Sequence, residues 1–169
     1  MTLAASVRAF VGLGSNVGDR RASLARAVDL LRRAPSVQVV GLSALYETPA
    51  WGYLAQAPFL NAAVAVETAL GPRQLLVALK SFEARIGRRR TFRWGPRVID
   101  LDILAYDDLT LDRRGLSLPH PALAERAFAL LPLADVCPEF RAPDGRTLPE
   151  LLAGLDLQGI RLVREAPWA

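Results

Sequence analysis

Hydrophobic positions along the chain follow two different periods, one typical of strands and one typical of helices. Continuous or alternating apolar residues predict four long strands, over residues 7–13, 37–48 and 59–67 and within residues 93–104. The segment between the second and third strands, residues 49–58, is rich in proline, glycine and aromatic residues and predicts a loop.

Two amphipathic helices are predicted between these strands. Leu24, Val28 and Leu31 recur at helical spacing and predict a helix over residues 19–34, before Pro35. The second helix begins at Pro72, a favoured early helical residue, and ends at Gly87. Its apolar stripe consists of Leu75, Leu76, Leu79, Phe82 and Ile86.

The resulting order is strand, helix, strand, strand, helix, strand. This order is typical of the split β-α-β, or ferredoxin-like, arrangement, in which an antiparallel sheet carries two helices on one face. A hairpin over residues 109–118 and short helices over 122–131 and 148–155 follow. Because no repeat or linker is visible, we predict one α+β domain over residues 1–169, with a ferredoxin-like βαββαβ core.

The composition narrows the class of protein. Hydrophobic residues make up 51% of the chain, which argues against disorder, and no apolar run approaches the ~18 residues that span a bilayer. The N-terminal segment lacks the basic region of a signal peptide, and Cys137 has no second cysteine to pair with. We therefore expect a cytoplasmic protein.

The chain is basic, with a formal net charge of +4. Almost all the positive charge is arginine, because Lys80 is the sole lysine. This balance predicts anionic partners without choosing among nucleotide, RNA and membrane surface. Arginine binds phosphate through two parallel hydrogen bonds, although genome composition or thermal adaptation would also produce the bias.

Two aspartates interrupt the fourth predicted strand. Asp100 and Asp102 are two residues apart and share one face, whereas Ile99, Leu101 and Ile103 share the other. Two carboxylates so close repel each other and lose hydration, so the pair needs a compensating charge. An edge strand with a solvated face is one explanation, and a Mg²⁺ ion between the carboxylates is the other.

We expect the strand over residues 59–67 to neighbour the strand that carries the aspartates. Phe59 and Asn61 then lie on the same face as the carboxylates. An aromatic ring and an amide two residues apart can stack on and hydrogen-bond a flat heterocycle. Alternatively, Asn61 is a buried amide that bonds only to the backbone.

An arginine-rich loop, "GRRRTFRWGPR", precedes the aspartates, and its basic residues are Arg88, Arg89, Arg90, Arg93 and Arg97. Arginines beside acidic metal ligands are suited to phosphoryl transfer, in which cations stabilise developing phosphate charge. The interleaved aromatics Phe92 and Trp94 also fit a groove for single-stranded nucleic acid. The adjacent aspartates argue against that alternative.

Several weaker signals remain. "GLGSNVGDR" resembles a dinucleotide fingerprint, but its glycines are spaced too widely, so it fits a generic turn between strand and helix, with a direct phosphate contact as the alternative. His120 precedes a proline and is by itself more typical of a structural histidine. Arg126 and Phe128 by themselves fit a helix charge and a core aromatic.

Five segments occur in order along the chain: "GLGSNVGD", "YETPAWG…FLNAAV", "RWGPRVIDLDIL", "LPHPALAERAF" and "LLPLADVCPE". Together they resemble the 6-hydroxymethyl-7,8-dihydropterin pyrophosphokinase family of folate biosynthesis, over roughly residues 8 to 150. The resemblance implies a ferredoxin-like α+β core. It also implies transfer of a pyrophosphoryl group from ATP to the pterin hydroxymethyl oxygen, with release of AMP.

The resemblance also implies roles for individual residues. Asp100 and Asp102 would hold two Mg²⁺ ions and, with Arg88 and Arg97, form the catalytic set. The implied pterin-binding residues are Thr48, Pro49, Trp51, Phe59, Asn61, Trp94 and Phe128. The implied ATP-binding residues are Glu83, Arg88, Arg90, Trp94, Arg97, Ile103, Ser117, His120 and Arg126.

Three alternatives remain open at this stage. A ferredoxin-like module could bind a heterocycle without catalysis, and an RNA-binding domain could use the same sheet face. A conventional kinase that moves only the γ-phosphoryl group would share every local feature, and only the resemblance separates it from a pyrophosphokinase. We expect ATP and the pterin as partners, no nucleic acid or membrane, and a monomer.

Overall fold

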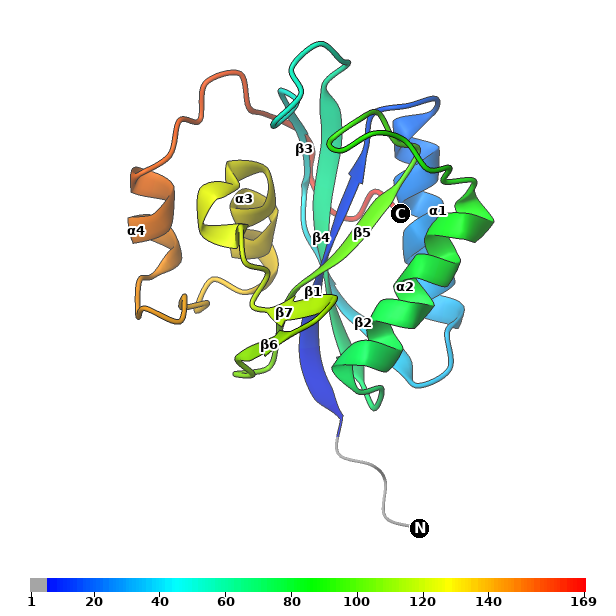
Figure 1. Ribbon diagram of the computed structural model, residues 1–169, viewed down its shortest axis with the longest axis vertical. Coiled ribbons are helices and arrows are strands. Elements are labelled where there is room, and N and C mark those ends of the chain that lie inside the picture. The colour runs from blue at the N-terminus through cyan, green and yellow to red at the C-terminus, as the bar shows by residue number, and fades with distance from the viewer. Residues whose placement is uncertain (1–5) are drawn as a thin grey trace.

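A central antiparallel sheet is flanked by helices on both faces in the computed structural model, which describes residues 6–169 (Figure 1). The elements in chain order are β1 (Val7–Ser15), α1 (Arg20–Arg33), β2 (Val37–Leu42), β3 (Leu45–Thr48), β4 (Phe59–Thr68), α2 (Pro72–Ile86), β5 (Asp100–Tyr106), β6 (Leu111–Arg113), β7 (Leu116–Leu118), a 3₁₀ turn (Leu123–Glu125), α3 (Ala127–Val136), α4 (Leu148–Ala153) and β8 (Arg161–Arg164). Residues 1–5, on which part of the signal-peptide prediction rests, lie outside the described residues. None of the helices in residues 6–169 has the length and apolar composition needed to cross a membrane.

The strand order confirms the ferredoxin-like prediction. The sheet runs β5-β1-β4-β3-β8, β2 also pairs with β4, and every pairing is antiparallel. One part of the prediction was wrong. β4 does not neighbour β5, because β1 lies between them and pairs with both. The residues opposite Asp100 and Asp102 are therefore Gly14 and Gly12 of β1.

The two predicted helices form where the sequence places their start and stop signals. Asp19 caps α1, because its carboxylate accepts a hydrogen bond from the amide of Ala22 at 2.9 Å. Pro72 opens α2, and Gly87 ends it in the left-handed conformation with φ 113°. Both helices bury their apolar stripes against the sheet, so α1 and α2 lie together on one face.

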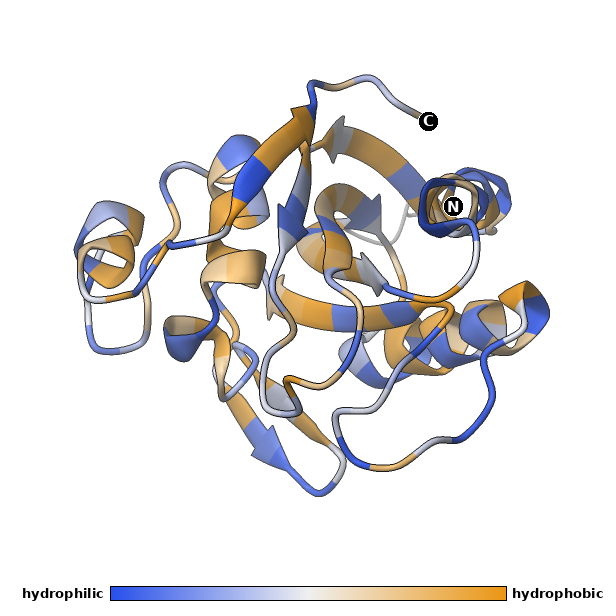
Figure 2. Cartoon of the chain, turned by 90° about the horizontal axis from the view of Figure 1, so that it is seen from above, coloured by the Kyte–Doolittle hydropathy of each residue, from blue (hydrophilic) through white to orange (hydrophobic). Residues whose placement is uncertain are grey.

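The core has two parts, one on each face of the sheet, and Figure 2 shows the mostly hydrophobic strands enclosed between helices. On the α1–α2 side, Leu101 and Ile103 of β5 are buried together with Ile99, which directly precedes the strand, as the strand periodicity predicts. On the other side, Leu130 and Leu133 of α3 pack against the small residues of β4. Asp100 and Asp102 face this second side, near α3.

The predicted strand over residues 37–48 is two strands. It breaks at Ser43 and Ala44, between β2 and β3. Ser43 turns its hydroxyl to the backbone and accepts a hydrogen bond from the amide of Ala63 at 2.7 Å. The amide of Ala44 donates to the carboxylate of Asp135 on α3 at 3.0 Å. Hydrogen bonds to distant segments replace regular strand pairing at Ser43 and Ala44. The hydrophobic periodicity of the segment could not predict these hydrogen bonds.

The helix predicted over residues 122–131 begins later than expected. Arg126 has non-helical backbone angles, with φ −116° and ψ 88°, so α3 starts at Ala127 after a separate 3₁₀ turn. The helix continues through Pro132 to Val136. Arg126 is therefore not a charge on a helix surface, and its side chain reaches the cavity described below. The hairpin of β6 and β7 and the helix α4 form within the predicted segments.

The C-terminal segment contributes a strand that the sequence analysis missed. β8 pairs with β3, and the chain then brings Trp168 into the core beside α1 and the sheet. Trp168 is only 5% exposed, and its indole N–H donates to the carbonyl of Ser43 at 2.7 Å. This contact joins residues 125 positions apart.

We expect Trp168→Ala to lower the free energy of unfolding by about 3–5 kcal/mol, because it removes a buried indole and leaves a cavity. Trp168→Phe should lower it by about 1–3 kcal/mol, since a smaller ring still fills part of the site but the Ser43 carbonyl loses its donor. Urea unfolding measures both values. Leu162→Ala, at a residue that is 51% exposed, is the control, and an equal loss there would contradict a specific anchor.

Candidate active site

A cavity lies between the sheet and the start of α3. Its lining combines apolar side chains with a few convergent polar groups, as is usual for a site that holds a small organic ligand. Twelve of the residues predicted from the sequence line it: Thr48, Pro49, Trp51, Phe59, Asn61, Trp94, Arg97, Asp100, Asp102, His120, Arg126 and Phe128. The fold therefore brings together residues that are up to 80 positions apart along the chain.

Two glycines of β1 make room for the cavity. Gly12 pairs with Asp102 on one side and Ala63 on the other, and Gly14 pairs with Asp100 and Asn61. A Cβ atom on Gly14 would lie 2.9 Å from the Asn61 side-chain oxygen. The missing side chains leave the middle of the sheet face open. Residues 12–14 thus form part of the cavity floor.

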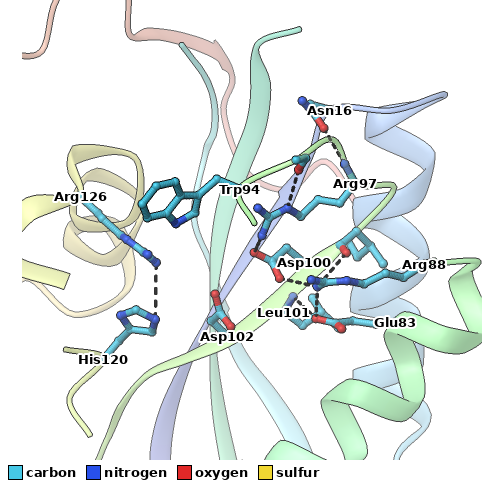
Figure 3. A network of polar contacts seen from close by, with 12 residues as sticks. Asn16, Glu83, Arg88, Trp94, Arg97, Asp100, Leu101, Asp102, His120 and Arg126 are labelled. Atoms are coloured by element: carbon cyan, nitrogen blue, oxygen red, sulfur yellow. Dashed lines mark hydrogen bonds and ion pairs between the residues drawn. The ribbon is translucent and has the colours of Figure 1, made fainter. Parts of the chain in front are cut away.

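Asp100 is held by two arginines from the loop before β5 (Figure 3). One carboxylate oxygen pairs with Arg88, and the other accepts from Arg97 Nη1 at 2.7 Å. Burial alone would raise the pKa of Asp100, but the charges of Arg97 and Arg88 act against it and lower the pKa below its usual value. Asp100 is therefore a carboxylate at neutral pH.

Asp102 has a different environment. Its nearest cation is Lys80, whose Nζ lies 3.7 Å from the carboxylate. Burial raises the pKa of Asp102, and the neighbouring charge of Asp100 raises it further. Figure 3 shows Asp102 between the cluster of Asp100 with its arginines and the pair of His120 and Arg126. The side chain is open to the cavity and lacks a close cationic partner of the kind that Asp100 has.

Glu83 on α2 lies behind this pair and is only 4% exposed. One carboxylate oxygen accepts hydrogen bonds from the amide of Leu101 at 2.7 Å and from Lys80 Nζ at 2.8 Å. The same oxygen lies 2.9 Å from Arg88. Glu83 thus orients two cations and the backbone of β5. Its burial places it as a support of the site, so a direct ATP contact by this side chain is not favoured.

Four other predicted ATP-binding residues lie outside the main cavity. Arg88 and Arg90 line a second recess, formed by α2 and the arginine-rich loop. Ser117 on β7 donates a hydrogen bond to Asp112 at 2.8 Å. The Ile103 side chain is buried in the core on the α1–α2 side, so only its backbone is available to a nucleotide. Their contacts with ATP stay predictions.

His120 and Arg126 form the wall opposite the acid pair. Their closest side-chain nitrogens are 3.5 Å apart. Burial lowers the pKa of His120 despite the opposing charge of Asp102, so the imidazole is neutral at pH 7. The Arg126 Nε is buried and has no hydrogen-bond partner among the described residues. A buried guanidinium nitrogen without a partner is suited to an anionic ligand.

Aromatic rings enclose the other end of the cavity. The rings of Trp51 and Trp94 meet edge to face, with their centroids 5.5 Å apart, and Trp51 lies 6.4 Å from Phe128. Arg126 lies over the Trp51 ring at 4.7 Å. On the floor, the Asn61 amide donates to the Thr48 hydroxyl at 2.7 Å. This end can therefore accept a flat ring with polar edges.

The two ends of the cavity have complementary chemistry. The aromatic end suits a heterocycle, and the end with acids and arginines suits phosphate groups and a divalent cation. Carboxylate oxygens are ligands that Mg²⁺ prefers. Among residues 6–169, no group of three His, Cys, Asp or Glu side chains is placed to hold a metal. A cation at Asp100 and Asp102 would therefore take its remaining ligands from water and substrate.

Five residues of the site were not singled out as site residues by the sequence analysis: Gly12, Gly14, Asn16, Gln56 and Lys80. The two glycines could have been found, because alternate glycines in an apolar strand mark a face that something else occupies. Lys80 could not, since a single lysine on a helix is normally solvated. The roles of Asn16 and Gln56 depend on contacts between distant segments.

Comparison with known proteins agrees with this geometry. A model of the family described as 7,8-dihydro-6-hydroxymethylpterin-pyrophosphokinase matches residues 10–138. The chain is 51% identical over 156 residues to the 2-amino-4-hydroxy-6-hydroxymethyldihydropteridine pyrophosphokinase of Methylorubrum extorquens. The alignment covers 92% of this chain and 98% of that protein. It is 44% identical over 153 residues to the protein of that name from Pseudomonas aeruginosa, with 90% and 94% coverage.

Solved structures share the fold. The crystal structure of wild-type Plasmodium falciparum HPPK-DHPS with STZ-DHP aligns with a TM-score of 0.69, over 89% of this chain and 43% of that chain. The wild-type structure with SDX-DHP gives a TM-score of 0.65. The chain thus spans less than half the length of these structures. Sequence identities are 16% and 19%, so these comparisons support the fold alone.

We expect Glu83→Gln to lower the free energy of unfolding by about 1–3 kcal/mol, because it leaves Lys80 and Arg88 without their buried countercharge. Chemical unfolding measures the change. Glu67→Gln is the matched control, since Glu67 pairs with Arg8 at an exposed surface, where such pairs contribute less than about 1 kcal/mol. Equal losses in the two variants would contradict a supporting role for Glu83.

Proposed function

The chain belongs to the 7,8-dihydro-6-hydroxymethylpterin-pyrophosphokinase family, and we propose that it transfers the pyrophosphoryl group of ATP to the hydroxymethyl oxygen of 6-hydroxymethyl-7,8-dihydropterin. The second product is AMP, and the pathway is tetrahydrofolate biosynthesis. The family uses ATP as its co-substrate. A cytoplasmic location, a monomeric state and the absence of nucleic-acid partners remain predictions from the sequence.

One observation carries the proposal. A single cavity has aromatic rings and an amide at one end and paired aspartates with arginines at the other. A reaction between a flat heterocycle and a polyphosphate requires both environments side by side, so that the reacting atoms meet. A module that only binds a heterocycle has no need of the acid pair, and an RNA-binding face would not place carboxylates on its floor.

The pterin occupies the aromatic end. Phe59 and Phe128 contact its two ring faces, and Trp51 and Trp94 complete the enclosure. Asn61 and the backbone from Thr48 to Trp51 bond its polar edge. The side-chain hydrogen bond between Asn61 and Thr48 fixes the orientation of the amide before the ligand arrives. This preorganisation lowers the entropy lost on binding.

The phosphates of ATP occupy the other end. Arg88 and Arg97 already contact Asp100 there, and they can bond phosphate oxygens with their remaining N–H groups. Arg126 and neutral His120 approach from the opposite wall, and the unpartnered Nε of Arg126 supports its role in anion binding. Arg90, Ser117 and the backbone of Ile103 would extend this subsite, and Glu83 would support it from behind without contacting ATP.

Asp100 and Asp102 fit the requirements for holding Mg²⁺. They share one face of β5, and the charge of Asp100 raises the pKa of Asp102, a conflict that a divalent cation would relieve. Two bound Mg²⁺ ions would neutralise phosphate charge and complete their coordination with water and phosphate oxygens. Each carboxylate would then be an oxygen ligand, and its basicity as a proton acceptor would fall.

The transfer step balances as a substitution at the β-phosphorus. A bond forms between the hydroxymethyl oxygen and this phosphorus, the bridge from the β-phosphorus to the α-phosphate oxygen breaks, and AMP leaves with that oxygen. The hydroxyl proton passes to solvent water. Arg97 and Arg126 stabilise charge on the transferred group from two sides, and the aromatic end holds the hydroxyl in line. Positioning and electrostatics therefore supply most of the acceleration.

Product analysis tests the proposal. The protein is mixed with ATP, Mg²⁺ and 6-hydroxymethyl-7,8-dihydropterin, and the nucleotides are separated by chromatography. We expect AMP in amounts that depend on the pterin. ADP would instead identify a conventional kinase or an ATPase. Binding of the pterin with no nucleotide turnover would support the heterocycle-binding module and contradict the proposed reaction.

We expect Asp100→Ala and Asp102→Ala each to reduce turnover by on the order of 100-fold or more, as is typical when a group that stabilises transition-state charge is removed. The fold should persist, because both side chains face the cavity and not the core. AMP formation and circular dichroism measure the two properties. Asp108→Ala, at an exposed position after β5, is the control. Near-normal Mg²⁺-dependent turnover in either variant would remove the metal assignment.

A further inference from the structure

Ion pairs join six side chains around the acid pair into one connected series, which we call the charge chain. In order of contact, its members are Arg97, Asp100, Arg88, Glu83, Lys80 and Asp102. Cations and carboxylates alternate along it, three of each, so its formal net charge is zero. Figure 3 shows Arg97, Arg88 and Glu83 gathered on one side of Asp102. The protein by itself therefore balances the formal charge of the acid pair.

Lys80 is the member that connects Asp102 to the rest of the charge chain. Its Nζ donates to the Leu101 carbonyl and to Glu83 Oε1, both at 2.8 Å. The same nitrogen lies 3.7 Å from Asp102 Oδ1, too far for a hydrogen bond but close enough for an ion pair. Among residues 6–169, no other Lys, Arg or His side chain forms an ion pair with Asp102. Lys80 therefore acts on Asp102 through its charge.

A lysine at this position is unusual for this chain. Twenty-one residues are lysine or arginine, and Lys80 is the only lysine. The other basic residues of α2 are Arg73 and Arg85. The Lys80 nitrogen brings two hydrogen bonds and one ion pair to a single point, between α2 and β5. A compact ammonium group can do this, whereas a guanidinium group donates in fixed directions from a planar fork.

The balanced charge has a consequence for metal binding. A divalent cation held by Asp100 and Asp102 would give this neutral cluster an excess of positive charge. Lys80 would repel that cation, because both would share the Asp102 carboxylate as a neighbour. Only 44% of the Lys80 side chain is exposed, so solvent screens this repulsion incompletely.

We propose that Lys80 sets the affinity of the acid pair for a divalent cation. Its charge compensates Asp102 in the free protein and weakens the binding of the cation there. The inference rests on the proposed function, which assigns that cation to Asp100 and Asp102. Lys80 acts through Asp102 and is not itself a metal ligand, because an ammonium group has no lone pair to donate. It is therefore a positioning residue and not a catalytic one.

The experiment measures Mn²⁺ binding to the full chain without nucleotide, by electron paramagnetic resonance of the free ion. Mn²⁺ is the probe because it prefers the same carboxylate and water ligands as Mg²⁺. Lys80→Gln and Lys80→Met both remove the charge, and Lys80→Met also keeps the length of the apolar stem. We expect both variants to bind Mn²⁺ about tenfold more tightly than the unmodified protein, because a unit charge no longer repels the divalent ion.

Three further variants serve as controls. Lys80→Arg keeps the charge, so its affinity should stay within about threefold of that of the unmodified protein. Arg85→Gln removes the same formal charge from an exposed position of α2, where solvent screens it, and should also stay within about threefold. Asp102→Ala should lose the binding, because it removes a ligand.

Thermal unfolding supplies a second readout. Without metal, Lys80→Gln should unfold at a lower temperature than the unmodified protein, because Glu83 and Asp102 lose a countercharge. The same concentration of Mn²⁺ should raise the unfolding temperature of Lys80→Gln by more, since stabilisation by a ligand grows with its affinity. A purely structural role for Lys80 would lower the unfolding temperature equally with and without Mn²⁺.

The outcomes separate this inference from the proposed function. Mn²⁺ affinities in Lys80→Gln and Lys80→Met equal to or weaker than that of the unmodified protein would overturn the inference, even if AMP is formed. Mn²⁺ binding that persists in Asp102→Ala would overturn both the inference and the metal assignment. Tighter binding in the two variants without AMP formation would support the inference and contradict the proposed reaction. If Lys80→Gln fails to fold, Lys80→Met decides the result.

Discussion

The proximity of Asp100 and Asp102 is the constraint on which the rest of the site depends. Two carboxylates on one strand face cannot both be buried without compensating charge. Arg88 and Arg97 pair with Asp100, Lys80 approaches Asp102, and Glu83 holds two of these cations from behind. Arg88 and Arg97 of the basic loop and the sole lysine therefore compensate the negative charge of the acid pair. The incomplete compensation at Asp102 leaves a position where a divalent cation is favourable.

The sheet meets a second constraint, which is space. Its α1–α2 face is filled by close-packed aliphatic side chains, whereas the face toward α3 must hold both a helix and a ligand cavity. Small residues allow this, because Gly12 and Gly14 leave the central strand without side chains beside the carboxylates. The α1–α2 face of the sheet thus carries the main hydrophobic core, and the face toward α3 carries the reactive groups.

Much of the site could be predicted from local pattern and family resemblance. The strand period placed Asp100 and Asp102 on one face, and twelve predicted residues line one cavity. Local pattern failed where distant segments decide the structure. The break at Ser43 depends on Ala63, the late start of α3 at Ala127 frees Arg126, and β8 forms because β3 has an open edge. Contacts between such distant segments produce no hydrophobic periodicity in the sequence, so local pattern could not predict them.

The sequence by itself determined the order of strands and helices in the βαββαβ core, the division of β5 into an apolar and an acidic face, and the basic character of the loop before it. These features follow from residue spacing, which the backbone geometry of a single element converts into direction. Only the tertiary structure decided that β1 lies between β4 and β5, that Glu83 supports the acid pair, and that Asn16 meets Gln56. Each of these depends on strand order and loop packing, which are set by the burial of the whole core and not by any one segment.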